Sequence, residues 1–379
     1  MPLWPTLDNN VLFGPGALSR LDDYLGNYRH IVLFVDRDGF PQCGAAAYFD
    51  SRQADLKIKT YAYSGKALPL EDVEAVYDQV KGDNDIDLII GLGGGTIIDL
   101  AKIISLAYAN GCRRVADVLE DRALDKKIDL IFVPTTAGTG SEATTFAVVY
   151  RDKIKLSLVS PHFLPRLVVL DPLLLRSLPE AVLNSTILDA LAQGVESIWA
   201  LGGTPGSRQF AGQSVSLIYE NVFLENSLHR LEHLQLGSFF SGKAINISRT
   251  TLPHSISYPL TAHFGIPHGL AVFLTLPAVA RFNYLASPAD LAPGLSPAHI
   301  QESFALLFRL FSVTDIDSLV GRLEEVLTRL HFQPRLSDYG IQSSDLRGLA
   351  DQALTKGRSD NNPRRIDSDK IFQLLQQIF

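Results

Sequence analysis

Hydrophobic positions in the first 170 residues follow two different spacings. Short apolar runs typical of strands occur at 31–35, 56–63, 86–92 and 130–133. Apolar residues at helical spacing lie between them, at 70–80 and 96–109. Because strands that alternate with helices are joined by parallel crossovers, this half predicts an open parallel α/β sheet. Two further runs within 148–159 predict a hairpin appended to that sheet.

The pattern changes after Asp171-Pro172, where strand-like runs end. Helical spacing then covers 180–200, 208–224, 236–248, 268–284, 316–330, 345–354 and 367–378. We therefore expect a dinucleotide-binding α/β domain over 1–172 and an all-helical domain over 173–379. Small ligands commonly bind where two unlike domains meet.

Composition and charge narrow the range of functions. The 379 residues are 46% hydrophobic and 20% charged, which is typical of globular proteins. A formal net charge of -7 without a basic stripe disfavours nucleic-acid binding. Two cysteines make no disulfide framework, and the start MPLWPTLDNN lacks a signal-peptide layout, so we expect a cytoplasmic protein. The apolar stretch 269–280 is too short to span a membrane.

A glycine-rich turn follows the strand predicted at 86–92. It consists of Gly93, Gly94 and Gly95. Thr96 is expected to cap the next helix, which carries Asp99. Residues without Cβ let the backbone approach a ligand, and the N–H groups at a helix N-terminus attract phosphate. The turn indicates a pyrophosphate site, and a tight turn that serves packing alone is the alternative.

A second loop of small and hydroxyl residues follows the strand predicted at 130–133. Its hydroxyl residues include Thr135, Thr136, Thr139 and Ser141. Open α/β sheets bind ligands at the carboxyl ends of their strands, so two such loops indicate one nucleotide site. A polar loop without a ligand is the alternative.

Four side chains in the second half have the chemistry of a metal site. Asp189 and Gln193 are four residues apart, on one face of a predicted helix. His254 and His268 lie in the segments TTLPHSISY and GIPHGLA. Together they offer a carboxylate oxygen, two imidazole nitrogens and a weak, neutral amide to a divalent ion. Taken singly, each histidine is more typical of a structural imidazole than of a ligand, and a polar pair at this spacing is more typical of a solvated helix face.

These motifs together resemble those of the iron-containing (group III, metal-dependent) alcohol dehydrogenases, over most of the chain and in the same order. The matching runs are GGGTIIDLAK, PTTAGTGSEAT, DALAQGVES and the histidine pair that ends in PHG. The resemblance implies the two-domain architecture shared with dehydroquinate synthase. It also implies an NAD(P)H-dependent reduction of a small aldehyde to a primary alcohol, by a homodimer or a larger homo-oligomer.

The resemblance also implies roles for individual residues. Asp189, His254 and His268 match three ligands of Fe2+, Zn2+ or Mn2+, and Gln193 stands where the usual member has histidine. Tyr258 stands where many members carry a further histidine near the nicotinamide, and it could relay a proton. The implied cofactor site comprises Asp36, Arg37, Gly93, Gly94, Gly95, Thr96, Asp99, Thr135, Thr136, Thr139, Ser141 and Lys155.

The variant helix motif and the segment that leads to PHG are similar to those of the phosphonoacetaldehyde reductases, which make 2-hydroxyethylphosphonate in phosphonate biosynthesis. Leu270 departs from their pattern, which has a further histidine there. Because burying an anionic phosphonate requires cations, Lys243 and Arg249 are its expected partners. An acidic residue such as Asp36 would favour NAD, whereas Arg37 would accommodate the 2'-phosphate of NADP, and both remain open.

Three alternatives remain open from the sequence. The substrate could be another small aldehyde or alcohol, such as lactaldehyde or glycerol. A dehydroquinate synthase-like cyclase, which is a lyase, shares the architecture but usually carries differently spaced metal ligands. A metal-free, non-catalytic member is the third, because Gln193 is a weak ligand.

Overall fold

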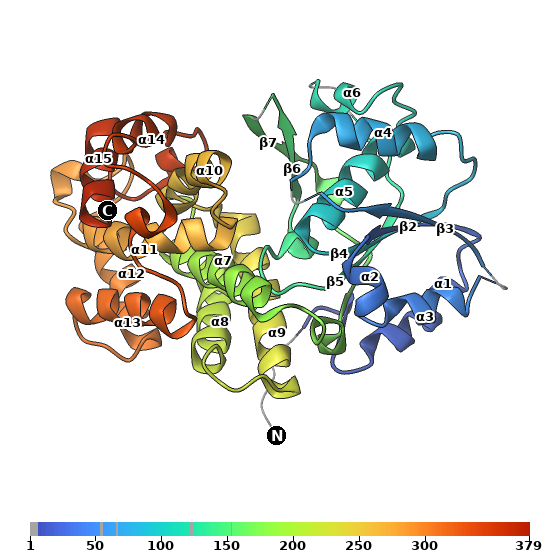
Figure 1. The fold of residues 1–379 in the computed structure, drawn as a ribbon, viewed down its shortest axis with the longest axis horizontal. Coiled ribbons are helices and arrows are strands. Elements are labelled where there is room, and N and C mark those ends of the chain that lie inside the picture. The colour runs from blue at the N-terminus through green and yellow to red at the C-terminus, as the bar shows by residue number, and fades with distance from the viewer. Residues whose placement is uncertain (1–6, 54–55, 66, 121–123, 153) are drawn as a thin grey trace. The chain divides into compact units, whose positions relative to one another are not determined.

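The computed structural model describes residues 7–53, 56–65, 67–120, 124–152 and 154–379 (Figure 1). The first six residues, which belong to the segment that lacks a signal-peptide layout, lie outside the described residues. The chain divides into two compact units. The first comprises the described part of Met1–Pro179 together with Asn226–Gln235, and the second comprises Glu180–Glu225 and Leu236–Phe379.

The first unit contains a six-stranded sheet in the order β1-β8-β5-β4-β2-β3. All five neighbouring pairs are parallel, which confirms the predicted α/β sheet. The strands are β1 (Val11–Phe13), β2 (His30–Asp36), β3 (Lys57–Tyr63), β4 (Leu88–Gly93), β5 (Asp129–Pro134) and β8 (Leu167–Leu170). We did not predict β1 and β8, because three or four residues are too short for a periodic pattern.

Helices lie on both faces of this sheet. Figure 1 shows α4 and α5 on one side and α1, α2 and α3 on the other. The bounds are α1 (Asp22–Leu25), α2 (Gly39–Gln42), α3 (Ala45–Asp50), α4 (Leu70–Val80), α5 (Gly95–Ala109) and α6 (Ala116–Leu119). Because both faces are covered, the strands β2, β4 and β5 are almost entirely buried, which explains their continuous apolar runs.

The predicted hairpin is present as β6 (Phe146–Arg151) and β7 (Ile154–Val159). The prediction that it would be appended to the parallel sheet is wrong, because β6 and β7 form a separate two-stranded sheet. β5 is already paired with β4 and β8 on its two sides, so it offers no free edge. The hairpin is held instead by a hydrogen bond from the Tyr150 N–H to the Leu68 carbonyl, at 2.8 Å.

The described residues of the second unit fold into helices, turns and a single isolated bridge, as the sequence predicts. The helices are α7 (Glu180–Trp199), α8 (Pro205–Asn221), α9 (Leu228–Ser248), α10 (Leu252–Phe264), α11 (His268–Tyr284), α12 (Pro297–Leu310), α13 (Ile316–Arg329), α14 (Leu346–Gln352) and α15 (Ser368–Gln377). The start of α9 belongs to the first unit. We did not predict α10, which carries Pro253 in its first turn and Pro259 in its interior. We also did not predict α12, which begins at Pro297.

Helix α7 lies at the core of the second unit. From Leu183 to Trp199 only Thr186 is not buried, and the helix packs against α8, α11 and α12. A helix buried all round leaves no solvated face for its polar residues. Polar side chains on α7 therefore need partners within the protein.

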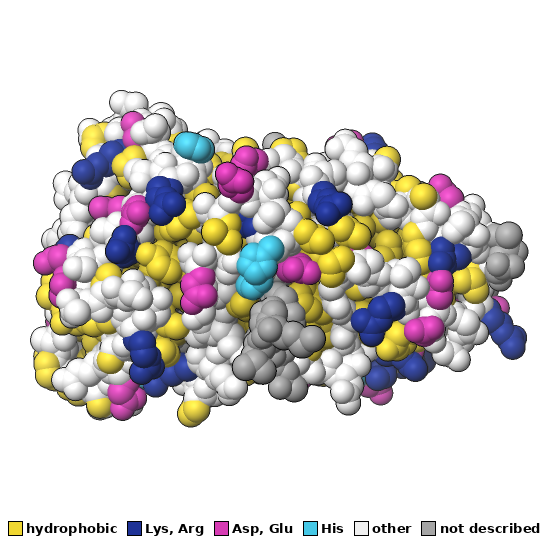
Figure 2. All heavy atoms as spheres, turned by 90° about the horizontal axis from the view of Figure 1, so that it is seen from below, with side chains coloured by type: hydrophobic (Ala, Val, Ile, Leu, Met, Phe, Trp, Pro, Cys, Tyr) yellow, Lys and Arg dark blue, Asp and Glu magenta, His cyan; other side chains and the backbone are white. Residues whose placement is uncertain are grey.

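Two properties of the described residues bear on partners. No described helix has both the length and the apolar character needed to cross a membrane. On the face drawn in Figure 2, basic and acidic side chains of the described residues are interspersed. That face presents both signs of charge rather than the basic stripe on which nucleic-acid binding depends.

Candidate functional site

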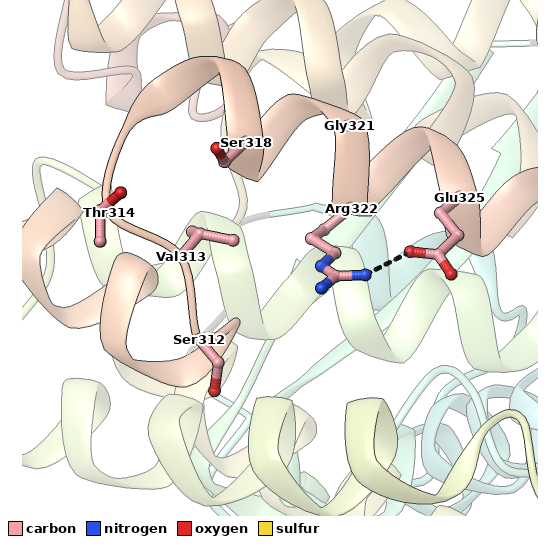
Figure 3. Close-up of a pocket in the computed structure, with 7 residues that line it drawn as sticks. All are labelled: Ser312, Val313, Thr314, Ser318, Gly321, Arg322 and Glu325. Carbon is pink, nitrogen blue, oxygen red and sulfur yellow. Dashed lines mark hydrogen bonds and ion pairs between the residues drawn. The ribbon is translucent and has the colours of Figure 1, made fainter.

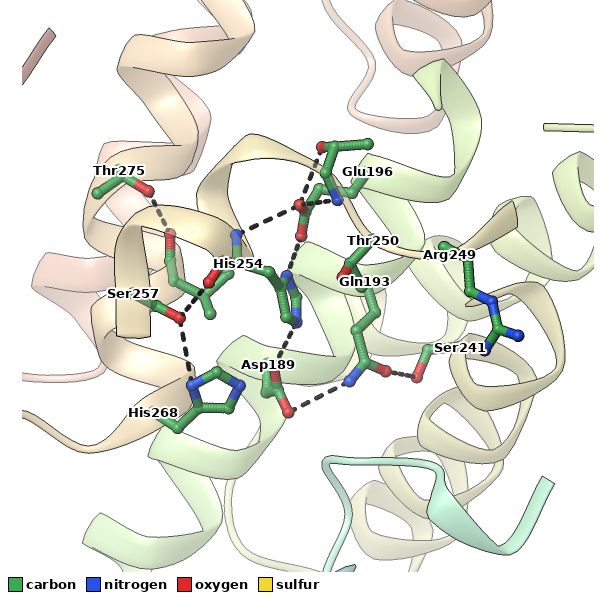
Figure 4. A network of polar contacts seen from close by, with 12 residues as sticks. Asp189, Gln193, Glu196, Ser241, Arg249, Thr250, His254, Ser257, His268 and Thr275 are labelled. Carbon is green, nitrogen blue, oxygen red and sulfur yellow. Dashed lines mark hydrogen bonds and ion pairs between the residues drawn. The ribbon is translucent and has the colours of Figure 1, made fainter. Parts of the chain in front are cut away.

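The second unit brings together three residues that are far apart in the sequence. Asp189 on α7, His254 on α10 and His268 at the start of α11 each offer one ligand atom within 4.8 Å of the others. The Nε2 atom of His254 is 3.2 Å from the Asp189 Oδ1 atom. Asp189 and His254 are buried, and His268 is partly exposed (Figure 4). The three predicted metal ligands are thus gathered at one place.

The approach of α11 to α7 depends on Gly269. A Cβ atom at this position would lie 2.1 Å from the Ser185 carbonyl oxygen and 2.9 Å from the Asp189 Cβ atom. Only glycine allows this contact without displacing backbone. Because His268 is the preceding residue and the first of α11, Gly269 sets the position of its imidazole beside Asp189.

Each histidine is also held through its Nδ1 atom. The Nδ1 atom of His254 is hydrogen-bonded to Glu196 Oε2. The His268 Nδ1 atom lies 3.3 Å from Ser257 Oγ, whose hydroxyl donates to the His254 carbonyl at 2.7 Å. Because this hydroxyl has one proton, it accepts from the His268 Nδ1–H. Both histidines therefore present Nε2 to a ligand.

Gln193 supports the group in a different way. Its Nε2 atom donates to Asp189 Oδ2 at 3.2 Å, and its Oε1 atom lies 2.8 Å from Ser241 Oγ (Figure 4). In this orientation the amide holds the second oxygen of Asp189. Coordination through Oε1 requires a rotation of the amide by 180°, after which Nε2 would face Ser241.

Glu196 is a site residue that our sequence reasoning missed. It is fully buried and lies seven residues after Asp189 on the same face of α7. Its Oε1 atom accepts hydrogen bonds from the Thr251 N–H at 2.8 Å and the Thr251 hydroxyl at 2.9 Å. The spacing in DALAQGVES contained the signal, because positions i, i+4 and i+7 share one face of a helix.

The two carboxyl groups change the proton affinity of His254. Burial lowers the pKa of His254, but the neighbouring Glu196 and Asp189 outweigh burial and raise it to about 10. Without a metal, His254 is therefore an imidazolium at neutral pH, with one proton on each ring nitrogen. One carboxylate oxygen and two imidazoles suit a divalent ion such as Fe2+ or Zn2+, which would replace the proton on Nε2.

We expect the apparent metal affinity to rise with pH. The pKa of His254 is raised, so the competing proton is bound throughout the neutral range and leaves only as the pH approaches about 10. Between pH 6 and 8 the affinity should increase by about tenfold per pH unit for one displaced proton. Titration calorimetry with Zn2+ in buffers of different ionisation enthalpy measures this proton release. An affinity that does not change with pH would contradict it.

Gly269→Ala should weaken metal binding. The new methyl group would collide with the Ser185 carbonyl, so α11 must move away from α7 and take His268 with it. Such overpacking also costs about 1–3 kcal/mol of folding free energy. Gly212→Ala in α8 is the matched control, because its methyl group meets no atom within 4 Å. Chemical denaturation and metal titration of both variants test this, and equal metal affinities would contradict it.

The two loops predicted to bind a nucleotide pack against each other in the first unit. The Thr135 N–H donates to the Gly93 carbonyl at 3.0 Å. A Cβ atom at Gly95 would lie 2.6 Å from Thr139 Oγ1, and one at Gly94 would lie 3.3 Å from Thr136 Cγ2. The missing Cβ atoms thus serve the packing of the loops as well as the approach of a ligand. The predicted cap at Thr96 is wrong, because Gly94 is the N-cap and Thr96 lies inside the first turn of α5.

Asp99 lies in a buried network that joins α5 to the second loop. Its carboxyl oxygens accept from Ser141 Oγ and from the Val148 N–H, the latter at 2.9 Å. Burial raises the pKa of Asp99, whereas Lys102, Ser141, Val148 and Lys155 lower it. Asp99 is therefore occupied by protein donors.

Lys102, which our sequence reasoning did not include in the site, completes this network. Its ammonium donates to the Ser141 carbonyl at 2.6 Å and to Thr144 Oγ1 at 3.0 Å. Burial lowers the pKa of Lys102 to about 8, although Asp99 and Glu142 raise it. The network fixes the second loop against the helix that begins at the glycine turn.

The remaining predicted cofactor residues belong to other segments of the first unit. Asp36 ends β2, which pairs with β4, and its carboxylate accepts from the Gly39 N–H at 2.5 Å. Arg37 is exposed, and its N–H donates to the Tyr63 carbonyl at 2.9 Å. Lys155 lies on β7, opposite Tyr150.

The predicted substrate and proton-relay residues lie in the second unit. The Tyr258 ring stacks on His268, with 6.1 Å between ring centroids. The Lys243 ammonium lies 4.6 Å from the centre of the Phe210 ring. Arg249 follows the end of α9 with a left-handed φ of 63°. Its side chain is half-buried, and burial and the charge of Arg358 lower its pKa.

A hollow on the second unit shares no residue with this group. It is lined by Ser312, Val313, Thr314, Ser318, Gly321, Arg322 and Glu325. Arg322 and Glu325 form a surface ion pair at 2.8 Å (Figure 3). We assign it no function.

Comparison with known proteins identifies the family. Residues 8–172 match the model of iron-containing alcohol dehydrogenases, and residues 184–379 match the C-terminal model of the same family. This chain belongs to the iron-containing alcohol dehydrogenase family. Membership confirms the resemblance found in the sequence and the enzyme class, an alcohol dehydrogenase or aldehyde reductase. It also agrees with the predicted metal and nicotinamide cofactors.

Three relatives illustrate the range of similarity. A phosphonoacetaldehyde reductase of Streptomyces viridochromogenes is 34% identical over 304 residues, which is 76% of this chain and 75% of that protein. A sulfoacetaldehyde reductase of Bilophila wadsworthia is 26% identical and covers 97% of both chains. The crystal structure of a sulfoacetaldehyde reductase from Bifidobacterium kashiwanohense in complex with NAD+ has a TM-score of 0.85 at 24% identity, over 99% of this chain and 98% of that one.

Proposed function

We propose that this protein is a metal-dependent NAD(P)H aldehyde reductase that converts phosphonoacetaldehyde to 2-hydroxyethylphosphonate in phosphonate biosynthesis. The observation that carries the proposal is the convergence of Asp189, His254 and His268. The 34% identity to a phosphonoacetaldehyde reductase supports the choice of substrate. In this proposal residues 1–172 bind the dinucleotide and residues 173–379 bind the metal and the substrate.

The metal would be held by Asp189 and the Nε2 atoms of His254 and His268. Bound Fe2+, Zn2+ or Mn2+ stabilises the negative charge that develops on a carbonyl oxygen during reduction. Gln193 would serve as a weak fourth ligand after its amide rotates. Its Nε2 atom would then donate to Ser241 Oγ, which already lies 2.8 Å from the amide.

The dinucleotide would be held by the two loops of the first unit. The glycine turn and the first turn of α5, with Thr96, present backbone N–H groups and a positive dipole end to the pyrophosphate. Thr135, Thr136, Thr139 and Ser141 would line the adenosine and ribose side, with Lys155 beside a ribose. The resemblance implies that Asp99 belongs to the pyrophosphate and nicotinamide side. Because its oxygens accept from Ser141 and Val148, we propose that it acts by fixing the two loops to each other. Asp36 would bind the ribose of NAD, or Arg37 the 2'-phosphate of NADP.

Reduction also requires a proton for the product oxygen. Tyr258 stacks on His268, so we propose that its hydroxyl holds or relays this proton. Solvent and the cofactor ribose are the alternative donors. The family resemblance further suggests a homodimer or a larger homo-oligomer. Two cysteines that make no disulfide framework agree with a cytoplasmic protein.

The anionic group of the substrate would bind near Arg249, five residues before His254, with Lys243 as a second predicted partner. We propose Arg358 as a third partner, because its charge lowers the pKa of Arg249. Asn361 joins the segment that carries Arg358 to the segment that carries Arg249. Its Nδ2 atom donates to the Ser248 and Thr250 carbonyls at 2.8 and 3.0 Å. Two nearby guanidinium groups repel each other, and a phosphonate would relieve that repulsion.

The proposed reaction predicts a preference for anionic aldehydes. Metal-loaded enzyme should consume NADH or NADPH faster with phosphonoacetaldehyde than with propanal, which has no charged group. Sulfoacetaldehyde, lactaldehyde and the reverse oxidation of glycerol complete the panel. Assays with each cofactor, before and after chelation and with added Fe2+, Zn2+ or Mn2+, measure the preference. Faster turnover of propanal would contradict the phosphonate assignment, and net turnover without NAD(P)H consumption would indicate a cyclase.

Arg249→Ala should raise the Michaelis constant for phosphonoacetaldehyde by roughly 10- to 100-fold, because a charge-assisted hydrogen bond contributes about 1.5–3 kcal/mol. The constant for propanal should change little. Arg358→Ala and Lys243→Ala test the other cations in the same way. Arg309→Ala is a control, because this arginine lies in the last turn of α12 and belongs to none of the proposed sites. Equal effects of Arg249→Ala on charged and uncharged aldehydes would remove Arg249 from the substrate site.

A further inference from the structure

A chain of buried hydrogen bonds leads from Trp199 to His254. Trp199 determines which group donates and which accepts in the bonds that follow. The indole N–H of Trp199 can only donate, and it donates to Thr251 Oγ1 at 3.0 Å. The Thr251 hydroxyl therefore donates its proton to Glu196 Oε1, at 2.9 Å. Trp199, Thr251 and Glu196 are all fully buried, so water does not compete for these bonds.

The Glu196 carboxyl group receives donors on both oxygens. Oε1 accepts the Thr251 N–H at 2.8 Å as well as the Thr251 hydroxyl. Oε2 contacts His254 Nδ1. A backbone N–H cannot reverse its role and the hydroxyl is committed by Trp199, so the only adjustable partner is the imidazole. A carboxylate at this position therefore favours the proton on Nδ1.

We propose that Glu196 is a positioning residue that holds His254 in the Nδ1–H tautomer and thereby directs the Nε2 lone pair to the metal. This inference rests on the proposed metal site. Histidine ligands commonly donate their second N–H to a carboxylate, which fixes the ring and makes the ligand more basic. His268 differs, because its Nδ1 atom faces the neutral hydroxyl of Ser257 rather than a carboxylate.

The substitution Glu196→Gln tests the positioning role of Glu196, because it keeps the shape of the side chain and replaces one acceptor oxygen by an NH2 donor. The new amide must direct its oxygen to the Thr251 N–H, which cannot reverse. Its NH2 group then faces His254 Nδ1 and favours a proton on Nε2, the atom that would bind the metal. We expect a 10- to 100-fold loss of Zn2+ and Co2+ affinity.

The experiment compares the full-length wild type, Glu196→Gln and Ser303→Ala. Ser303 is buried and donates to the Ile198 carbonyl at 3.1 Å, so its loss perturbs the same helix without touching a proposed ligand. Metal affinity is measured by competition with a chromophoric chelator, and the ligand field by the visible spectrum of bound Co2+. Only Glu196→Gln should lose affinity and shift the Co2+ spectrum, even if both variants lose thermal stability.

The outcomes separate this inference from the proposed function. If the wild type binds metal and Glu196→Gln binds it equally well with the same Co2+ spectrum, Glu196 does not position His254, and the metal-dependent function stands. If the wild type binds no metal, both proposals fail. Should Glu196→Gln not fold, 15N NMR of histidine-labelled, Zn2+-loaded wild type decides: a proton on Nδ1 of His254 supports the inference, and metal on Nδ1 overturns it.

Discussion

The contact between α11 and α7 at Gly269 is the constraint on which the candidate metal site depends. Asp189 is built into the most buried helix of its unit, so it cannot move toward its partners. His268 must therefore be brought to it, and a side chain of even one carbon at Gly269 would meet the Ser185 carbonyl at 2.1 Å. Close packing of backbone against backbone thus determines where an imidazole lies.

Burying charged groups has to be offset by pairing them. Asp189, Glu196 and His254 are all at least nine-tenths buried, and an isolated ion there would be strongly unfavourable. The three groups form a line in which His254 lies between two carboxyl groups. The same line makes His254 basic and orients it, so the solution to the burial problem also prepares a ligand.

The first unit also buries charged groups, Lys102 and Asp99, and there the partners include neutral oxygens and N–H groups. Lys102 is fully buried, and its three N–H groups are shared among four oxygens of the second loop and the hairpin that lie within 3.0 Å of its ammonium. Asp99, one turn earlier on α5, accepts from Ser141 in the same loop. A loop fixed by charged side chains keeps its shape when a ligand is absent, and pre-organisation of this kind reduces the ordering that binding requires.

The sequence by itself determined the fold class, the family and the identity of the residues that the second unit gathers. Periodicity revealed the long central strands and most helices, because these depend on local spacing. It did not reveal β1 and β8, which are too short for a periodic pattern, and it did not reveal α12 or α10, the latter with two prolines that mask the helical pattern. It also placed the hairpin wrongly, because free sheet edges are a property of the assembled sheet. Only the tertiary structure decided that Gln193 holds Asp189, that Glu196 faces His254 and that Lys102 supports the second loop, because these roles depend on distances between segments that no local pattern encodes.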